Sequence, residues 1–251
     1  MIHAVVKYAP GMTTRYSRGM ANYITSGNGA SSPGYLVLMR HGQTAWSLSG
    51  QHTGRTDIPL TDEGERQATE GGRRLREAFP SGFDAPDVLV SPLSRARMTA
   101  ERAGFEHYRT TEDLLEWDYG RAEGRTRDQV SQLLGRQWEL WRDGTEALDG
   151  ISTGEWVAGL PTGRKILVRN GVGETIEEVA LRARHLLESV DRRVLSGHDV
   201  LLVAHAHVLR IVTSQWLGVD PRQARLLRFD TAHFSVLSYY KNDRVIDRWN
   251  L

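Results

Sequence analysis

Two short, continuously apolar runs, at residues 35–39 and 200–204, constrain the fold of this 251-residue chain most strongly. A short run without alternation is typical of a strand buried on both faces of a parallel sheet. Asp87–Val90 is a third such strand. Helical patterns separate the strands, over residues 61–79, from Pro92, and over residues 129–141 and 175–194. This alternation predicts an α/β fold: a single-domain, doubly wound, mostly parallel sheet with helices on both faces.

Local signals place some of the element ends. Thr61 comes before acidic residues and suits the N-cap of a helix that runs to about Phe79. Near the C-terminus, residues 234–240 and 244–249 look like strands joined by a turn at Asn242–Asp243. We expect this pair at an edge of the sheet.

Composition excludes several classes of protein. The net charge is only +1, with charged residues making up 25% of the chain, so nothing favours a nucleic-acid or membrane partner. No run is apolar and long enough to span a membrane. The chain has no cysteine, which rules out disulfides, thiolate nucleophiles and cysteine-ligated metals.

Two segments differ from the rest of the chain. Residues 1–33 lack apolar periodicity and acidic residues, and we interpret them as a flexible N-terminal extension to a domain at residues 34–251. A transit peptide, or a later start at Met12 or Met20, would share this composition. The stretch at about 145–170 contains glycines and a proline with little periodicity. We interpret it as an insertion that is either a lid or binding loop or a decoration.

Histidine follows two of the predicted strands, as His41 and His205. Ligands of parallel α/β sheets bind outside the carboxyl ends of the strands, so the two imidazoles should lie near one another. Either histidine alone is better explained as a residue that caps a strand. Neighbouring arginines change that balance.

Arginines lie at the same predicted edge. Arg40 directly precedes His41, and Arg95 and Arg97 begin the helix that follows the strand at 87–90. Guanidinium groups match the oxygens of phosphate, and a helix N-terminus adds affinity for anions. The spacing therefore predicts a phosphate site.

A phosphate ester also needs a proton donor for its leaving oxygen. Glu116 and Asp118 are the candidates, and they would point to opposite sides of an extended segment. At most one of them faces the site. The flanking Trp117 and Tyr119 could keep the surroundings dry, whereas the alternative is an exposed acidic loop.

Four motifs in order make the chain resemble the histidine phosphatase, or phosphoglycerate mutase-like, superfamily. They are Arg40-His-Gly-Gln-Thr44, Ser91-Pro-Leu-x-Arg95-Ala96, Leu115-Glu-x-x-Tyr-Gly-x-x-Glu-Gly124 and Val203-Ala-His205. The resemblance implies that His41 accepts the phosphoryl group, that Arg40, Arg95 and His205 bind its oxygens, and that Glu116 donates the proton. Water would then hydrolyse the phosphohistidine, with Glu116 as the base. Arg97 is left as a supporting residue.

No metal and no cofactor are expected for this chemistry. Arginine and histidine supply the positive charge, and we find no carboxylate cluster suited to magnesium. His205 and His207 flank Ala206, but two histidines without further ligands at suitable spacing make a weak zinc site.

Within the superfamily, the chain looks most like the sugar-bisphosphatase and broad acid-phosphatase branch. That resemblance implies a substrate pocket suited to sugar phosphates or similar small metabolites, lined by Ser47, Gln51, His52, Thr53, Tyr119 and Arg210. Two positions depart from the common pattern. Ser47 replaces an asparagine that helps to hold the phosphoryl group, and Ala206 replaces a glycine. We expect altered phosphate geometry or specificity from the first, not inactivity.

We therefore expect a cytoplasmic phosphatase that acts on a small phosphate ester, with no nucleic-acid or membrane partner and with a homodimer left open. A phosphoglycerate mutase is the alternative, because mutases also carry additional sequence near residues 145–170. A mutase must shield its phosphohistidine from water with a closing lid, and a glycine-rich segment is poor support for one. A non-catalytic module that binds a phosphorylated ligand or a protein is the third interpretation.

Overall fold

The computed structural model describes residues 32–251, so the extension predicted for residues 1–33 lies outside the described residues except for its last two. A six-stranded sheet has the order β3-β2-β6-β1-β7-β8. The first four of these strands are parallel, and β7 and β8 are antiparallel additions at one edge. The strands are β1 Leu36–Arg40, β2 Val88–Val90, β3 Arg109–Thr110, β6 Val200–Ala204, β7 Phe234–Tyr240 and β8 Asp243–Arg248. The predicted fold class and edge position are confirmed.

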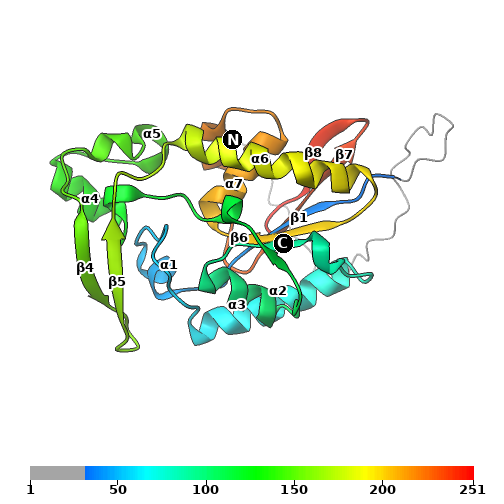
Figure 1. The fold of residues 1–251 in the computed structure, drawn as a ribbon, viewed down its shortest axis with the longest axis horizontal. Helices are drawn as coiled ribbons and strands as arrows, with labels where there is room; N and C mark the ends of the chain where they lie inside the picture. Colours follow the sequence, from blue (N-terminus) through cyan, green and yellow to red (C-terminus); the bar gives the residue numbers. More distant parts are fainter. Residues whose placement is uncertain (1–31) are drawn as a thin grey trace, which may run out of the picture.

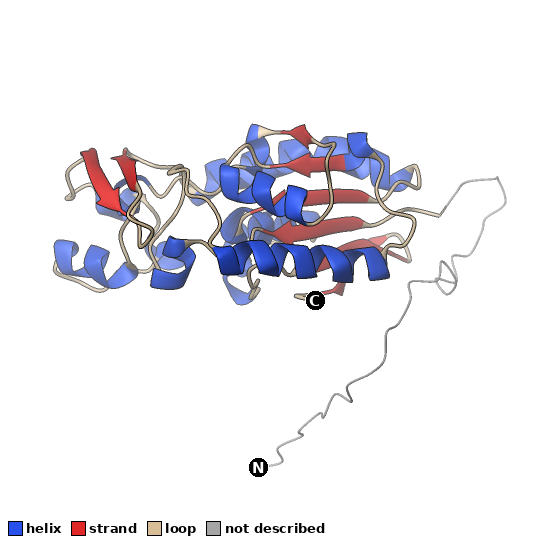
Figure 2. Ribbon diagram, turned by 90° about the horizontal axis from the view of Figure 1, so that it is seen from below, coloured by secondary structure: helices blue, strands red, loops and turns tan. Residues whose placement is uncertain are grey.

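Helices cover both faces of this sheet. Figure 1 shows α6 and α7 on one face and α2 and α3 on the other, and Figure 2 shows the strands between them. The helices are α1 Ala45–Ser49, α2 Asp62–Ala78, α3 Ser94–Arg102, α4 Arg127–Leu134, α5 Leu140–Asp143, α6 Ile176–Leu195 and α7 Ala206–Trp216. Single 3₁₀ turns occur at Ala85–Asp87, Glu112–Leu114, Gly120–Ala122 and Glu146–Leu148, and a longer one at Pro221–Leu226. Among the described residues, no helix is long and apolar enough to cross a membrane.

The two central strands feed two separate cores. In β1, Leu36 and Leu38 pack with the side chains of α6 and α7, whereas Val37 and Met39 pack with those of α2 and α3. β6 divides its side chains in the same way. Because successive strand residues point to opposite faces, a strand covered on both sides must be apolar at every position. This is why the two runs lack alternation.

The prediction of one helix over residues 129–141 is wrong. The segment forms two short helices, α4 and α5, because Gly135 ends α4 with a left-handed backbone (φ 66°) that glycine adopts without strain. Glu139 then caps the first turn of α5 by accepting from the backbone N–H of Arg142. The helix predicted from Thr61 is present, with Thr61 accepting from the backbone N–H of Gly64.

The stretch at 145–170 has more structure than the sequence suggested. It contains a β-hairpin of β4 (Gly154–Gly159) and β5 (Lys165–Asn170), which lies at one end of the molecule (Figure 2). Its inner face adds Ile166 and Val168 to a third core with Trp46. Exposed Val157 and Leu167 on the outer face interrupt the alternation of polar and apolar residues, which hid the strands from sequence reasoning.

The contact between α2 and α3 depends on one glycine. A Cβ atom added to Gly72 would lie 2.4 Å from the Cα of Ala103, a distance that real side chains do not adopt. We expect Gly72→Val to force the helices apart and to cost about 1–3 kcal/mol. Thermal unfolding should then occur several degrees lower. Gly150→Val, where no atom lies within 4 Å of the added Cβ, is the control. Equal melting temperatures for the two variants would contradict this account.

Candidate active site

The strand order brings the two predicted histidines together. β1 and β6 are adjacent and parallel, with Arg40 level with Ala204, so the next residue of each strand is His41 or His205. Their ring centroids lie 5.1 Å apart, and both side chains are buried. β2 lies on the other side of β6 and leads into α3, which carries Arg95.

His41 is held with one ring nitrogen free. Its Nδ1 lies 2.7 Å from the carbonyl oxygen of Gly42, which can only accept, so Nδ1 carries the proton and Nε2 keeps its lone pair. Burial lowers the pKa of His41 well below its ordinary value, and the charges of Arg95 and Arg40 lower it further. The imidazole is therefore neutral, which is the form that can attack an electrophile.

Arg95 is fully buried and almost fully engaged. It donates to the carbonyl oxygens of Thr53, Gly54 and Thr56 at 2.9–3.0 Å. Its Nε donates to Nδ1 of His205 at 3.0 Å. One N–H on Nη1 remains for a ligand.

His205 is oriented by this contact. An arginine Nε can only donate, so Nδ1 of His205 is the acceptor and its proton lies on Nε2, which faces the hydroxyl of Ser91 at 2.8 Å. Burial, and then the charge of Arg95, lowers the pKa of His205 well below its ordinary value. His205 could donate to a phosphoryl oxygen only by moving its Nε2–H away from Ser91.

The guanidinium of Arg40 keeps a hydrogen-bond donor without an acceptor in the described part of the chain. Its Nη1 donates to the carbonyl oxygen of Phe229 at 2.6 Å. Its Nε is buried and has no hydrogen-bond partner among the described residues. Buried donors are normally satisfied, so an unpartnered donor on the residue next to His41 is suited to an anion.

Glu116 lies at the N-terminus of α7. Its carboxylate accepts from the backbone N–H groups of His207 at 3.1 Å, Val208 at 2.9 Å and Trp117 at 2.9 Å. Burial would raise the pKa of Glu116, but contact with His207 and these N–H groups bring it well below its ordinary value. Glu116 is therefore a carboxylate in this structure, whereas the predicted role is that of a proton donor.

An arginine that sequence reasoning missed anchors the loop of Glu116. Arg182 of α6 donates to the carbonyl oxygens of Asp113, Leu115 and Glu116. It also forms an ion pair with Glu174 at 2.9 Å. Only the fold reveals this role, because Arg182 lies far along the chain on a helix with several arginines.

Glu116 and Asp118 have different surroundings, as their alternation predicted. Asp118 is half-buried, accepts from the backbone N–H of Gly120 and lies 3.8 Å from Arg55. Arg97 is exposed on α3, outside the group formed by His41, His205 and Arg95.

Three of the predicted pocket residues use their polar groups within the protein. Ser47 caps α1 by accepting from the backbone N–H of Thr44 and donating to its carbonyl oxygen. The amide of Gln51 bridges Ser49 and the carbonyl oxygen of Gly124. The hydroxyl of Thr53 donates to the carbonyl oxygen of Gln51. We therefore do not assign a phosphate contact to Ser47.

The other three pocket residues surround His207. The hydroxyl of Tyr119 lies 2.5 Å from Nδ1 of His207, and the ring of His52 packs against Tyr119 at 5.0 Å. The guanidinium of Arg210 lies 4.7 Å from the ring centre of Trp141, and its Nε donates to a backbone oxygen. The Nη groups of Arg210 form no hydrogen bond with the described residues and can meet a ligand.

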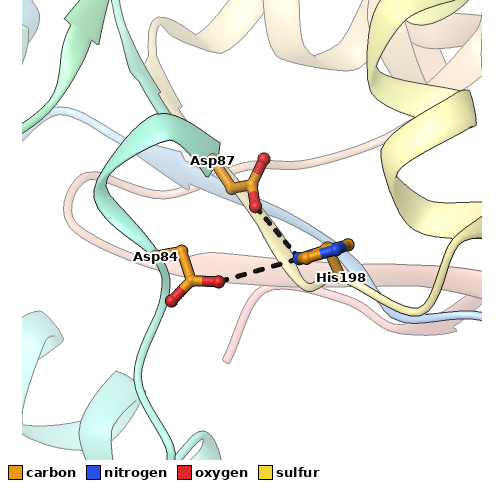
Figure 3. A group of neighbouring side chains, drawn as sticks. All are labelled: Asp84, Asp87 and His198. Carbon is orange, nitrogen blue, oxygen red and sulfur yellow. Dashed lines mark ion pairs between the residues drawn. The ribbon is translucent and has the colours of Figure 1, made fainter.

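The described residues contain one group with spacing suited to a metal, away from this site. Asp84, Asp87 and His198 converge near the N-terminal ends of β2 and β6, whereas His41 and His205 follow the C-terminal ends of their strands (Figure 3). The guanidinium of Arg193 contacts both oxygens of Asp87 and lies 2.9 Å from Nδ1 of His198. A fixed cation among the ligands would repel a metal ion, so we interpret the group as an ion-pair cluster.

Comparison with known families gives one match over most of the chain. Residues 36–251 match the family model of the histidine phosphatase superfamily, branch 1. An acid phosphatase from Mycobacterium tuberculosis is 32% identical over 81% of this chain and 86% of its own length. The sedoheptulose 1,7-bisphosphatase of Saccharomyces cerevisiae is 29% identical over 73% of this chain and 67% of its own.

Other relatives include mutases. A 2,3-bisphosphoglycerate-dependent phosphoglycerate mutase from Brucella anthropi is 31% identical over 75% of this chain and 84% of its own length. A solved structure of an open reading frame product from Mycobacterium tuberculosis superimposes with a TM-score of 0.70 and 30% identity. That match covers 87% of this chain and 97% of the solved one.

The buried histidines predict how stability depends on pH. Burial lowers the pKa of His52 to about 4 from 6.5. The unfolded chain therefore binds a proton near pH 6.5 that the folded chain refuses, and acid favours unfolding. We expect the free energy of unfolding to fall between pH 6.5 and about 4, with His52 contributing about 1.4 kcal/mol per pH unit.

Urea unfolding at pH 7.5 and 5.5 measures this slope. His52→Gln should make it shallower, and His185→Gln, at an exposed position on α6, controls for the loss of an imidazole. A slope unchanged by His52→Gln would contradict the buried, neutral state of that ring.

Proposed function

This chain belongs to the histidine phosphatase superfamily, and we propose that it hydrolyses small phosphate monoesters through a phosphohistidine on His41. It is a phosphoric monoester hydrolase. The observation that carries the assignment of His41 is its neutral ring, with Nε2 free and the buried guanidiniums of Arg40 and Arg95 nearby. His41 also directly follows β1, beside His205 at the end of β6.

The first step forms a bond between Nε2 of His41 and phosphorus, and the bond from phosphorus to the ester oxygen breaks. Negative charge on the phosphoryl oxygens is met by the unpartnered Nε of Arg40 and by the remaining N–H of Arg95. His205 joins them by turning its Nε2–H from Ser91 toward the phosphate. These groups are already desolvated, so little reorganisation is needed when charge develops.

Glu116 handles the proton. Glu116 is ionised in the protein alone, and a phosphate dianion bound beside it would raise its pKa because the two negative charges repel. The proton then passes from Glu116 to the leaving oxygen. In the second step, Glu116 takes a proton from the water that attacks phosphorus, and His41 is released.

The rest of the substrate would meet Arg210 and His52. The Nη groups of Arg210 can hydrogen-bond to hydroxyls or to a second anionic group, and Nε2 of His52 is free because its Nδ1 donates to the carbonyl oxygen of Arg125. A sugar phosphate or a similar small metabolite fits these groups. The acid phosphatase and bisphosphatase relatives support this class of substrate.

A mutase is the second candidate, supported by the Brucella anthropi relative. Interconversion of 3-phosphoglycerate and 2-phosphoglycerate, measured with and without 2,3-bisphosphoglycerate, separates the two activities. A non-catalytic binding module remains the third interpretation, and hydrolysis of p-nitrophenyl phosphate in EDTA by pure protein would exclude it. A cytoplasmic location and a homodimer stay predictions.

The nucleophile can be tested by substitution. We expect His41→Ala to reduce hydrolysis of p-nitrophenyl phosphate by at least about 1,000-fold, since covalent catalysis is lost. Acid-labile phosphoenzyme, trapped with a ³²P-labelled substrate, should disappear as well. His185→Ala is the control. Phosphoenzyme of normal yield in His41→Ala would assign the nucleophile elsewhere.

The proton donor is tested by the leaving group. We expect Glu116→Gln to slow sugar phosphates by about 100-fold or more, because an alkoxide must be protonated as it leaves. p-Nitrophenolate leaves without a proton, so its release should be affected much less. Rates of phosphoenzyme formation for both substrates provide the comparison. Equal losses would remove Glu116 from this role.

A further inference from the structure

A cleft lies outside the site that contains His41. It has a volume of about 490 Å³ and runs between β5 and the loop at residues 55–57. Clefts of 300–1,000 Å³ are typical of small-ligand sites. None of the proposed catalytic residues lines it.

Cations outnumber carboxylates in the lining of the cleft. Four cations line it, namely Arg55, Arg164, Lys165 and Arg169, against the single carboxylate of Asp57. Asp57 is already engaged, since it accepts from the backbone N–H and the hydroxyl of Ser94 at 2.7 Å. A concave surface lined by one sign of charge concentrates the field and attracts ligands of the opposite sign.

The four cations differ in what they already contact. Arg55 lies 3.2 Å from Glu174, and Arg169 lies 2.7 Å from Glu155. Arg164 and Lys165 are exposed and form no ion pair with the described residues. The unpaired charges therefore meet at the turn of the hairpin, beside two cations with carboxylate partners.

We propose that this cleft is a second anion-binding site, for a small organic compound that carries two or more phosphate groups. A ligand with several phosphates suits the cleft because its cations come from separate segments, namely the hairpin turn, β5 and the loop at residues 55–57. Guanidinium groups suit phosphate through paired N–H donors, and Lys165 adds a point charge. Exposed Leu167 gives the organic part of the ligand an apolar surface.

The loop between the cleft and the catalytic group belongs to both sites. Thr56 is one of the residues that line the cleft, and its carbonyl oxygen accepts from Arg95. Arg55 also lines the cleft and contacts Glu174, the carboxylate that pairs with Arg182. A ligand in the cleft would therefore touch the supports of both Arg95 and Glu116.

Direct binding tests the proposal without requiring turnover. The full chain is saturated with vanadate, which occupies the phosphoryl site, and tripolyphosphate is then titrated by calorimetry. We expect one binding event per chain at low salt, weakened as salt screens the charges. The double variant Arg164→Gln/Lys165→Gln should raise its Kd at least 10-fold.

The matched control is Arg192→Gln/Lys241→Gln, which removes the same two residue types. The end of α6 and the turn between β7 and β8, where these residues lie, are at the other end of the molecule from the hairpin (Figure 1). The control should keep the wild-type Kd. Absence of binding by vanadate-loaded enzyme, or equal weakening in both double variants, would overturn the proposal. Either result leaves the role of His41 untouched.

Substrate kinetics then identify the source of the anion. A raised KM of Arg164→Gln/Lys165→Gln for fructose 1,6-bisphosphate, with an unchanged KM for p-nitrophenyl phosphate, would assign the site to the far phosphate of a substrate. Unchanged KM values for both, together with the weaker tripolyphosphate binding, would assign it to a separate ligand.

Discussion

The buried guanidinium of Arg95 is the interaction on which the rest of the site depends. A charge taken out of water costs several kcal/mol unless it is paired and hydrogen-bonded. Here the carbonyl oxygens of Thr53, Gly54 and Thr56 and the ring of His205 meet that need. One side chain thus fixes a loop, a helix and the end of a strand relative to one another. Truncating it would leave these acceptors buried without donors.

Burial, and then the same charge, sets the protonation of the two histidines. A positive field and burial both disfavour imidazolium, so His41 and His205 are neutral. Burial would raise the pKa of Glu116, but contact with His207 lowers it, and the carboxylate is also held by N–H groups at the start of α7. The site therefore presents the lone pair of His41 beside fixed cations, an arrangement complementary to a phosphoryl group and not to a neutral ligand.

Sequence reasoning reached the residues of this site but not their contacts. His41 and His205 were predictable because strands covered on both faces are continuously apolar, and parallel strands end at one edge. The place of Glu116 against α7, and of Arg182 behind its loop, depends on contacts between distant segments that no local pattern encodes. Ser47 shows a different limit: its hydroxyl could contact a phosphate, but in the structure the same hydroxyl caps α1, a use that its chemistry allows equally.

Sequence reasoning missed the β4–β5 hairpin and the helix break at Gly135 for different reasons. β4 and β5 carry apolar residues on their exposed face, so the period-2 signal was lost. At Gly135, apolar spacing continued across a residue whose left-handed backbone ends the helix. Periodicity reports which faces are buried, and it does not report where a chain turns.

The proton needed for catalysis must enter an active site in which His41 and His205 are neutral and Glu116 is a carboxylate. A phosphate monoester has its second pKa near 6, so a growing share of substrate below that pH arrives as a monoanion that carries a proton. Such a substrate can leave its proton on Glu116 as it binds, and the site then holds the acid it lacked. Lower pH thereby favours activity, because it raises the protonated fraction of the substrate. Lower pH also destabilises the fold. The unfolded chain binds protons on histidines such as His52 and His207, whose pKa values are lowered in the folded chain. The upper limit of the working pH range is thus set by the loss of the substrate's proton. The lower limit is set by the loss of folding stability, since the buried imidazoles are neutral in the folded chain.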